Sequence, residues 1–170
     1  MDAYLAVVSK REVRSYAERP LGDEAERRIL EAGRLAGSSK NRQARRFVVL
    51  RDSALVEEAA ESVYAPDNVR GAAFVVAIVA GGKGPTSFDA GRAAQNMMLA
   101  ASNDAIGSCP NGIADAARLQ AAVGHGDDEQ VATILTFGYP ERPRDPERRS
   151  AEEWIARADR LPYEEVVEER

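Results

Sequence analysis

Apolar residues recur along the chain in two patterns, one typical of helices and one typical of buried strands. From Asp23 to about Ala36 they recur every three or four positions, which predicts a helix with one buried face. Three largely apolar runs of strand length predict buried strands, and these are Phe47–Leu50, Ala72–Val79 and Val131–Gly138. Helices that separate a few buried strands predict an α+β or α/β sandwich.

Further helices are expected between and after these strands. The segment from Ser87 or Asp89 to about Ser102 is rich in alanine and methionine, and apolar residues cover most of its circumference. Such a helix is buried at the centre of the fold or between subunits. The remaining helical segments are residues 4–8, residues 52–64 with Pro66 as the stop, residues 115–123 before Gly124, and residues 151–158.

Segments rich in glycine and proline predict turns and a detached tail. Ile106–Ile113 is turn-rich, and residues 139–149 hold three prolines and four arginines without sustained periodicity. We interpret the latter as an exposed linker whose arginines mostly face solvent. Leu161–Val167 is expected to form a final strand. The chain is therefore divided into a core, residues 1–140, and a C-terminal arm, residues 141–170, that packs on a partner subunit.

Composition removes several classes of function. The 170 residues carry a net charge of −5, so the protein as a whole is not suited to coat nucleic acid. Cys109 is the one cysteine and His125 the one histidine, which excludes an intramolecular disulfide and the usual metal sites. We interpret Cys109 as a small buried side chain. The chain shows no signal peptide and no run near the ~20 apolar residues of a membrane span, so we expect a soluble cytoplasmic protein.

Two basic clusters within this acidic chain are candidates for ligand binding. Ser38–Gln43 joins an expected helix to an expected strand and carries hydroxyls, amides and two cations but no carboxylate. Such a loop suits a polar or anionic ligand, although an ordinary helix-to-strand turn has the same composition. The second cluster, Lys10–Arg14, opens a new segment near the N-terminus.

Taken together, several segments resemble the FMN-dependent nitroreductase family. The likeness is carried by their order and spacing over nearly the whole chain, because each motif alone is weak. The segments are Lys10–Tyr16, Ala36–Gln43, Asp89–Ala101, Gly107–Gly112, Phe137–Pro140 and Arg160–Pro162.

The resemblance implies an α+β fold, a three-layer sandwich with a mainly antiparallel central sheet flanked by helices. It also implies a homodimer with FMN at the subunit interface and a C-terminal arm exchanged between subunits. The expected activity is ping-pong hydride transfer from NADH or NADPH through FMN to a nitroaromatic, a quinone or a similar small-molecule acceptor. No side chain is expected to act as acid or base, because the flavin carries the chemistry. Partners are a second copy and small molecules, with no nucleic acid and no membrane.

The resemblance also assigns three groups of cofactor-binding residues. Cations suited to the FMN phosphate are Lys10, Arg11, Arg14 and Arg160. The loop that meets the ribityl chain and the ring edge contributes Ser38, Ser39, Asn41 and Gln43. The segment that covers one ring face contains Cys109, Pro110, Asn111 and Gly112, with backbone N–H groups near the last two facing flavin N5.

Three positions depart from the family pattern. Glu12 stands where the family commonly has serine, and a flavin destructase branch, which cleaves reduced FMN with oxygen, has aspartate there. Ala44-Arg45 replaces a Pro-Trp pair and Gly37 replaces a proline, which is expected to loosen the cofactor loop. These departures keep alternatives open: a non-catalytic flavin-binding or flavin-sequestering dimer, a destructase-like enzyme, or a flavin-free structural dimer.

Overall fold

The computed structural model describes residues 2–170. Its internal contacts divide the chain into two compact units, one formed by residues 11–144 and one formed by the N-terminal residues through Lys10 together with residues 145–170.

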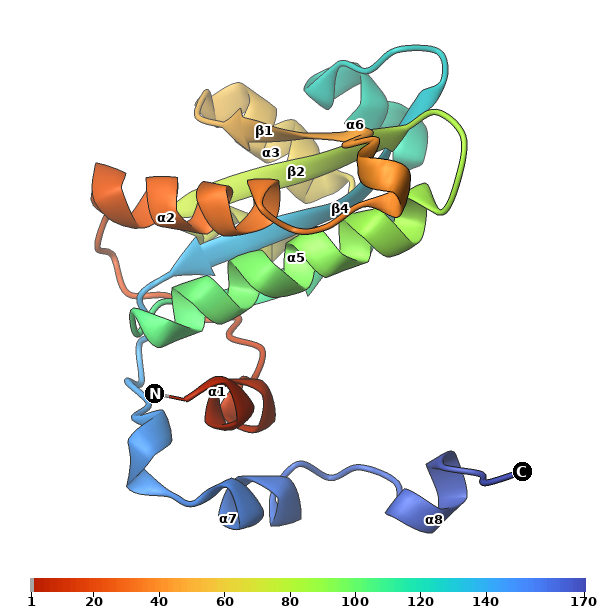
Figure 1. The fold of residues 1–170 in the computed structure, drawn as a ribbon. Coiled ribbons are helices and arrows are strands. Elements are labelled where there is room, and N and C mark those ends of the chain that lie inside the picture. Colours follow the sequence, from red (N-terminus) through yellow and green to blue (C-terminus); the bar gives the residue numbers. More distant parts are fainter. Residues whose placement is uncertain (1) are drawn as a thin grey trace. The chain divides into compact units, whose positions relative to one another are not determined.

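The larger unit is built on an antiparallel sheet. Within the described residues, four strands pair in the order β1-β2-β4-β3, and every neighbouring pair is antiparallel (Figure 1). The strands are β1 Arg45–Leu50, β2 Phe74–Gly81, β3 Gly107–Asn111 and β4 Glu129–Gly138. The two central strands β2 and β4 correspond to the longest apolar runs of the sequence.

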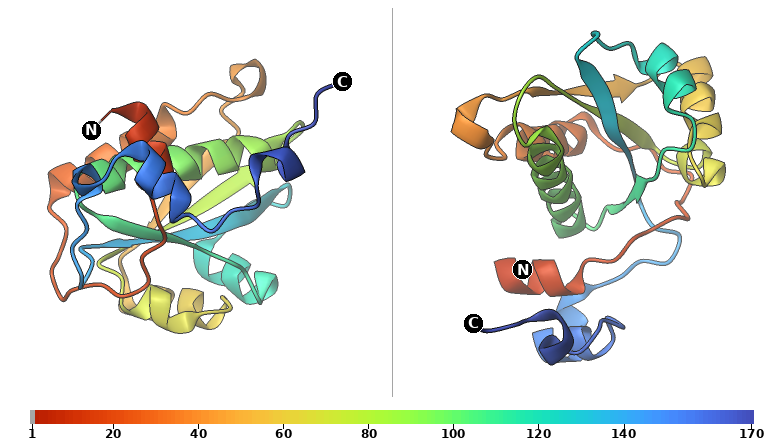
Figure 2. Two further views of the ribbon diagram at one scale, coloured as in Figure 1. Left: turned by 90° about the horizontal axis from the view of Figure 1, so that it is seen from below. Right: turned by 90° about the vertical axis from the view of Figure 1, so that its right-hand side faces the viewer.

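Helices cover both faces of this sheet (Figure 2). On one face lie α2 (Asp23–Arg34) and α5 (Thr86–Asn103), and on the other lie α3 (Ser53–Glu61), α4 (Pro66–Arg70) and α6 (Ala116–Val123). Side chains of β2 alternate between the two layers, as the pleat of a strand requires. Those packed with α2 and α5 include Val76 and Ile78, and those packed with α3 and α6 include Val75 and Ala77.

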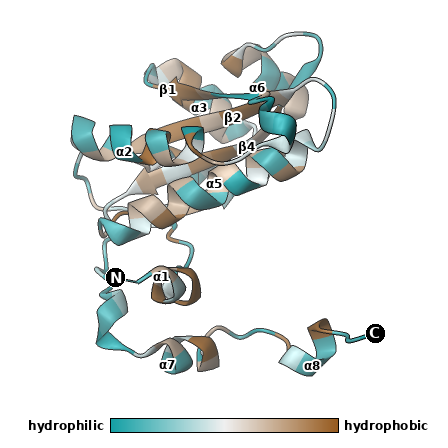
Figure 3. Ribbon diagram, in the orientation of Figure 1, coloured by the Kyte–Doolittle hydropathy of each residue, from teal (hydrophilic) through white to brown (hydrophobic). Residues whose placement is uncertain are grey.

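The predicted three-layer sandwich with a mainly antiparallel sheet is therefore confirmed, and the exchange of an arm between subunits stays a prediction. Figure 3 shows hydrophobic residues along β2 and hydrophilic residues on much of α2. No helix among residues 2–170 combines the length and the apolar character needed to cross a membrane.

Three sequence predictions of local structure are wrong. The turn-rich segment at 106–113 contains strand β3, because residues 107–111 pair with β4, and Pro110 is tolerated since β3 lies at the sheet edge. Pro66 does not simply stop a helix, because α3 ends at Glu61 and Pro66 begins α4, where its missing N–H costs nothing.

The expected strand at 161–167 is instead the short helix α8, Tyr163–Val166. Its first turn contains Glu164 and Glu165, which favour a helix N-terminus, and Pro162 precedes it.

The smaller unit holds short capped helices. Asp2 caps α1 (Ala3–Ser9) by accepting a hydrogen bond from the Leu5 N–H at 2.8 Å. Ser150 and Glu153 form a capping box at the start of α7 (Ala151–Ala156). Trp154 is buried in this unit and donates from Nε1 to the carbonyl oxygen of Pro146 at 2.8 Å, within the 3₁₀ turn η2 (Pro146–Arg148). The predicted boundary between residues 140 and 141, and the packing of the arm on a partner, stay predictions.

Candidate functional site

The loop Ser38–Gln43 is held in one conformation by hydrogen bonds from both ends. The Ser38 hydroxyl oxygen accepts from the Gln43 N–H at 2.9 Å, and the Ser39 N–H donates to Asp89 Oδ2 at 2.9 Å. Lys40, Asn41 and Gln43 have φ angles of 51°, 54° and 54°, in the left-handed region that non-glycine residues rarely occupy. A backbone of this kind persists only where the surrounding structure fixes it, which is common at ligand sites.

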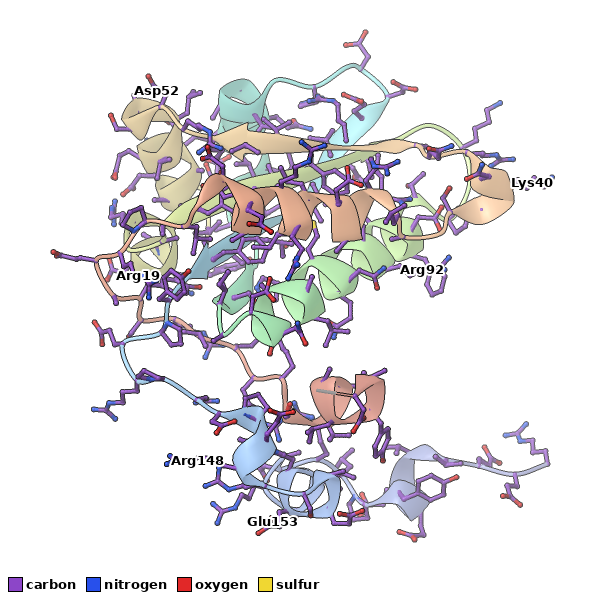
Figure 4. The ribbon with its side chains drawn as sticks, turned by 60° about the vertical axis from the view of Figure 1, so that its left-hand side comes forward. Arg19, Lys40, Asp52, Arg92, Arg148 and Glu153 are labelled. Atoms are coloured by element: carbon purple, nitrogen blue, oxygen red, sulfur yellow. The ribbon has the colours of Figure 1, made fainter. Side chains whose placement is uncertain are left out.

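The polar side chains of this loop are available to a ligand. Among residues 2–170, the side chains of Ser39, Asn41 and Gln43 form no hydrogen bond, and Asn41 and Gln43 are exposed. Lys40 projects from the tip of the loop (Figure 4). The loop therefore has a fixed backbone and unpaired amide and hydroxyl groups.

Asp89 is a positioning residue that the sequence interpretation did not select for the site. It lies in the first turn of α5, its side chain is buried, and its carboxylate ties this helix to the cofactor loop. The sequence signal was ambiguous, because an aspartate at a helix start is usually explained by the helix dipole alone.

The departures from the family pattern beside the loop do not leave it open. Arg45 donates from Nη2 to the carbonyl oxygen of Ala36, near the C-terminus of α2, where a cation is favourable. Its Nε and Nη1 atoms are buried without a partner in the described structure. A Cβ atom added to Gly37 would lie 2.7 Å from Arg92 Nη2, so a guanidinium occupies that space. Arginine side chains thus fill the space on both flanks of the loop.

The N-terminal segment with Arg11 and Arg14 is attached to the other end of the sheet. The Val13 N–H donates to the carbonyl oxygen of Ser108 at 3.0 Å, and Tyr16 forms a bridge with Pro140. The Tyr16 hydroxyl donates to the Val13 carbonyl oxygen at 2.7 Å and lies 3.0 Å from Thr136 Oγ1. Burial raises the pKa of the Tyr16 phenol, so it remains a protonated donor.

The four residues of the predicted ring-facing segment divide into a buried pair, Cys109 and Asn111, and an exposed pair, Pro110 and Gly112. Cys109 is buried, as predicted, and the buried Asn111 side chain donates to the carbonyl oxygens of Cys109 and Ile134, each at 3.2 Å. Asn111 Oδ1 also accepts from Asn68 Nδ2 at 3.2 Å. These side chains hold β3 in place rather than facing a ligand.

Pro110 and Gly112 are exposed at the outer edge of β3. Just beyond β3, the Gly112 carbonyl oxygen accepts from the Tyr64 N–H at 3.1 Å, next to the bridge between Val63 and Ile113. The exposed ring of Tyr64 lies against Gly112, where an added Cβ atom would be 3.2 Å from Tyr64 Cδ2. Gly112 is thus an exposed residue beside an aromatic ring.

Two groups of predicted cofactor residues lie at opposite ends of α5. Asp89 in its first turn contacts the loop, whereas β3, which binds Val13, begins beyond its last residue. Figure 1 shows these segments at the two ends of the helix. Since α5 has 18 residues, its ends are roughly 27 Å apart.

The remaining two predicted phosphate residues belong to the smaller unit. Lys10 follows α1, and Arg160 follows α7. Arg160 is exposed and donates from Nη1 to the carbonyl oxygen of Ala158 at 2.8 Å. Their position relative to Arg11 and Arg14 stays a prediction. No three His, Cys, Asp or Glu side chains in residues 2–170 are grouped to hold a metal ion.

Comparison with known proteins identifies the family. The family model described as "Nitroreductase family" matches residues 7–81 and 64–139. A protein from Archaeoglobus fulgidus, assigned as an NADH dehydrogenase or NAD(P)H nitroreductase, is 26% identical over 167 residues, covering 87% of this chain and 96% of the relative.

Solved structures support the same conclusion. A protein from Desulfovibrio desulfuricans, assigned as a nitroreductase and solved in complex with FMN, is 28% identical with a TM-score of 0.83, covering 100% of this chain and 98% of that one. The NADPH:FMN oxidoreductase of Vibrio harveyi, solved with NAD+, has the same fold at 23% identity and a TM-score of 0.81, covering 96% of this chain and 75% of that one. Since the family model matches most of its length, this chain belongs to the nitroreductase family.

Proposed function

We propose that this protein is an FMN-dependent NAD(P)H oxidoreductase whose cofactor is held between two copies of the chain. The observation that carries this proposal is the loop Ser38–Gln43, whose backbone is fixed while its polar side chains are unpaired. Ribityl hydroxyls and the polar edge of a flavin ring are partners of matching chemistry. The FMN complex of the Desulfovibrio desulfuricans relative supports the same cofactor.

The residues present fit the parts of FMN. Arg11 and Arg14, with Lys10 and Arg160 from the smaller unit, are cations suited to its phosphate. Gly112 is exposed at the edge of β3, and its lack of a side chain allows a flat ring to approach the backbone. Cys109 and Asn111 support this edge from inside, and Pro110 lies on its exposed side.

The separation along α5 supports a site made from two copies. The ribityl chain and the phosphate are adjacent parts of one small molecule, so the residues that hold them must lie close together. In one chain the loop and the arginines lie at opposite ends of a helix roughly 27 Å long. A two-fold arrangement brings the loop of one copy to the arginines of the other and yields two equivalent sites.

The chemistry requires little from side chains. When bound, FMN would supply hydride transfer from NADH or NADPH to an acceptor in two half-reactions. Asn41 and Gln43 would orient the ring edge, and Gly112 would allow the ring to approach the backbone. Nitroaromatics and quinones suit this site because they are flat, and the exposed ring of Tyr64 beside Gly112 offers them a stacking surface.

Anaerobic titration tests the function. The purified protein is saturated with FMN, and its flavin absorbance is followed during addition of NADH and, separately, NADPH. We expect the absorbance to bleach and to return when a quinone is added. A flavin-bound protein that neither nicotinamide bleaches would instead be a non-catalytic flavin binder. Failure to bind added FMN would leave a flavin-free dimer, and destruction of the reduced flavin in air would identify destructase-like chemistry.

A further inference from the structure

A pocket of about 420 Å³ lies within the larger unit, between the N-terminal segment and the chain that follows β4. It is lined by Glu12, Val13, Arg14, Ser15, Pro140, Glu141, Arg142 and Arg144. Sequence interpretation treated Arg142 and Arg144 as solvent-facing arm residues. They are exposed, as expected, and they also line one pocket with Arg14.

The backbone explains how distant residues form this pocket. Tyr16 bridges to Pro140, the Ala17 N–H donates to the Tyr139 carbonyl oxygen at 2.8 Å, and the Glu141 N–H donates to the Ser15 carbonyl oxygen at 3.3 Å. Two chain segments are therefore held side by side. Pro143 separates the two arginines of the second segment and restricts their backbone.

The arginines of this pocket differ from most arginines on the helices and strands of the same unit. Arg28, Arg46 and Arg118 form ion pairs with Asp104, Glu129 and Glu58 at 3.0, 2.9 and 2.6 Å. By contrast, Arg14, Arg142 and Arg144 make no hydrogen bond or ion pair within the described chain. All three are exposed, so their guanidinium groups are free to bind an anion.

The pocket also contains carboxylates, and these restrict the ligand. Glu12 and Glu141 line it together with the three arginines, which leaves an excess of one positive charge. An anion must therefore bind through directed hydrogen bonds to the guanidinium groups and not through a general positive field. A phosphate monoester has three terminal oxygens, so it can accept from three such groups at once.

We propose that Arg14, Arg142 and Arg144 form a binding site for a phosphate monoester. The inference rests on the proposed function for the source of the ligand, because that function supplies two such groups. One is the 5′-phosphate of FMN, and the other is the 2′-phosphate that distinguishes NADPH from NADH. In the first case Arg142 and Arg144 add to the phosphate contacts, and in the second they select the reductant.

The test compares Arg142→Gln/Arg144→Gln with Arg27→Gln/Arg157→Gln. The control removes two exposed arginine charges that form no ion pair within the described chain and do not line the pocket. The first probe is inorganic phosphate, titrated into the flavin-free protein and followed by the amide resonances of Val13–Ser15 and Glu141. Wild type and control should bind phosphate, and the pocket variant should bind roughly tenfold more weakly.

Two further measurements, of flavin affinity and of the KM for each nicotinamide, identify the source of the phosphate. If the FMN phosphate occupies the pocket, the variant loses FMN affinity roughly tenfold while riboflavin affinity is unchanged. If the NADPH phosphate occupies it, KM for NADPH rises while KM for NADH is unchanged.

The proposal is overturned if the pocket variant and the control have the same affinity for inorganic phosphate, the same affinities for FMN and riboflavin, and the same KM values for NADPH and NADH. That outcome leaves the proposed function intact as long as nicotinamides bleach the wild-type flavin. A wild type that binds phosphate in this pocket but no flavin would refute the proposed function alone.

Discussion

At the scale of single residues, a few buried polar side chains hold the candidate site in position. Tyr16 connects the arginine-bearing segment to Thr136 of β4, and Thr136 Oγ1 in turn donates to the Cys109 carbonyl oxygen at 3.2 Å. Asn111 lies 3.3 Å from the same Thr136 oxygen. These side chains form one buried polar cluster between the predicted phosphate segment and the predicted ring segment.

Replacing Tyr16 with phenylalanine should destabilise the protein by about 1–2 kcal/mol, because buried partners lose a hydrogen bond. Urea unfolding measures this change. Tyr64→Phe is the matched control, since Tyr64 is 79% exposed, and it should leave the stability unchanged. Equal effects of the two substitutions would contradict the role given to the buried hydroxyl.

The same residue predicts a pH dependence. Burial raises the pKa of Tyr16 above its ordinary value of 10.0, so the folded state retains a proton that the unfolded state releases. The stabilising effect is complete below pH 10 and is lost as the pH rises toward the folded pKa. Wild type should thus lose stability above pH 10 more steeply than Tyr16→Phe in unfolding measured across that range.

Asp89 is the residue on which the conformation of the cofactor loop depends most directly. Asp89→Ala removes the acceptor of the Ser39 N–H, so the loop should lose its fixed backbone and FMN affinity should fall roughly tenfold. Asp89→Asn retains an acceptor oxygen and should lose less. Flavin fluorescence titration measures the FMN affinity of both variants. Identical affinities in wild type, Asp89→Ala and Asp89→Asn would show that FMN binding does not depend on the Asp89 carboxylate.

At the scale of elements, the sequence predicted well where one interaction dominates and poorly where several compete. The apolar runs of β2 and β4 and the alanine-methionine helix α5 were located because burial alone determines them. Strand β3 was missed because glycine, proline and asparagine favour turns locally, and only pairing with β4 makes them a strand. The inward direction of Asn111 and the contact of Asp89 with the loop depend on tertiary neighbours, which local patterns do not contain.

One ion pair between elements gives a second pH prediction. Glu129, at the start of β4, accepts from Arg46 of β1 and from the Gly126 N–H, and these bonds lower its pKa to about 2. Its stabilising effect is present above the ordinary value of 4.5 and is lost as the pH falls toward 2. Thermal unfolding of Glu129→Gln should therefore depend less on pH than wild type between pH 4.5 and 2. Parallel curves would show that the pair contributes nothing.

At the scale of the whole molecule, the loop Ser38–Gln43 and the arginines Arg11 and Arg14 are separated by the length of α5. The resemblance to a family placed both groups near FMN, but only the fold revealed that α5 lies between them. We therefore propose that a single chain holds two half-sites. The central claim is that each cofactor joins the loop of one copy to the arginines of the other.

Complementation between two variants tests this claim most directly. Asn41→Ala/Gln43→Ala removes the loop contacts, and Arg11→Ala/Arg14→Ala removes the phosphate contacts, so each variant alone should retain little FMN. In a mixed dimer one site carries both defects and the other is intact. Co-expression should therefore restore roughly a quarter of the wild-type flavin content, measured by absorbance after gel filtration. Mixed dimers with no more flavin than either variant alone would contradict a site shared between copies.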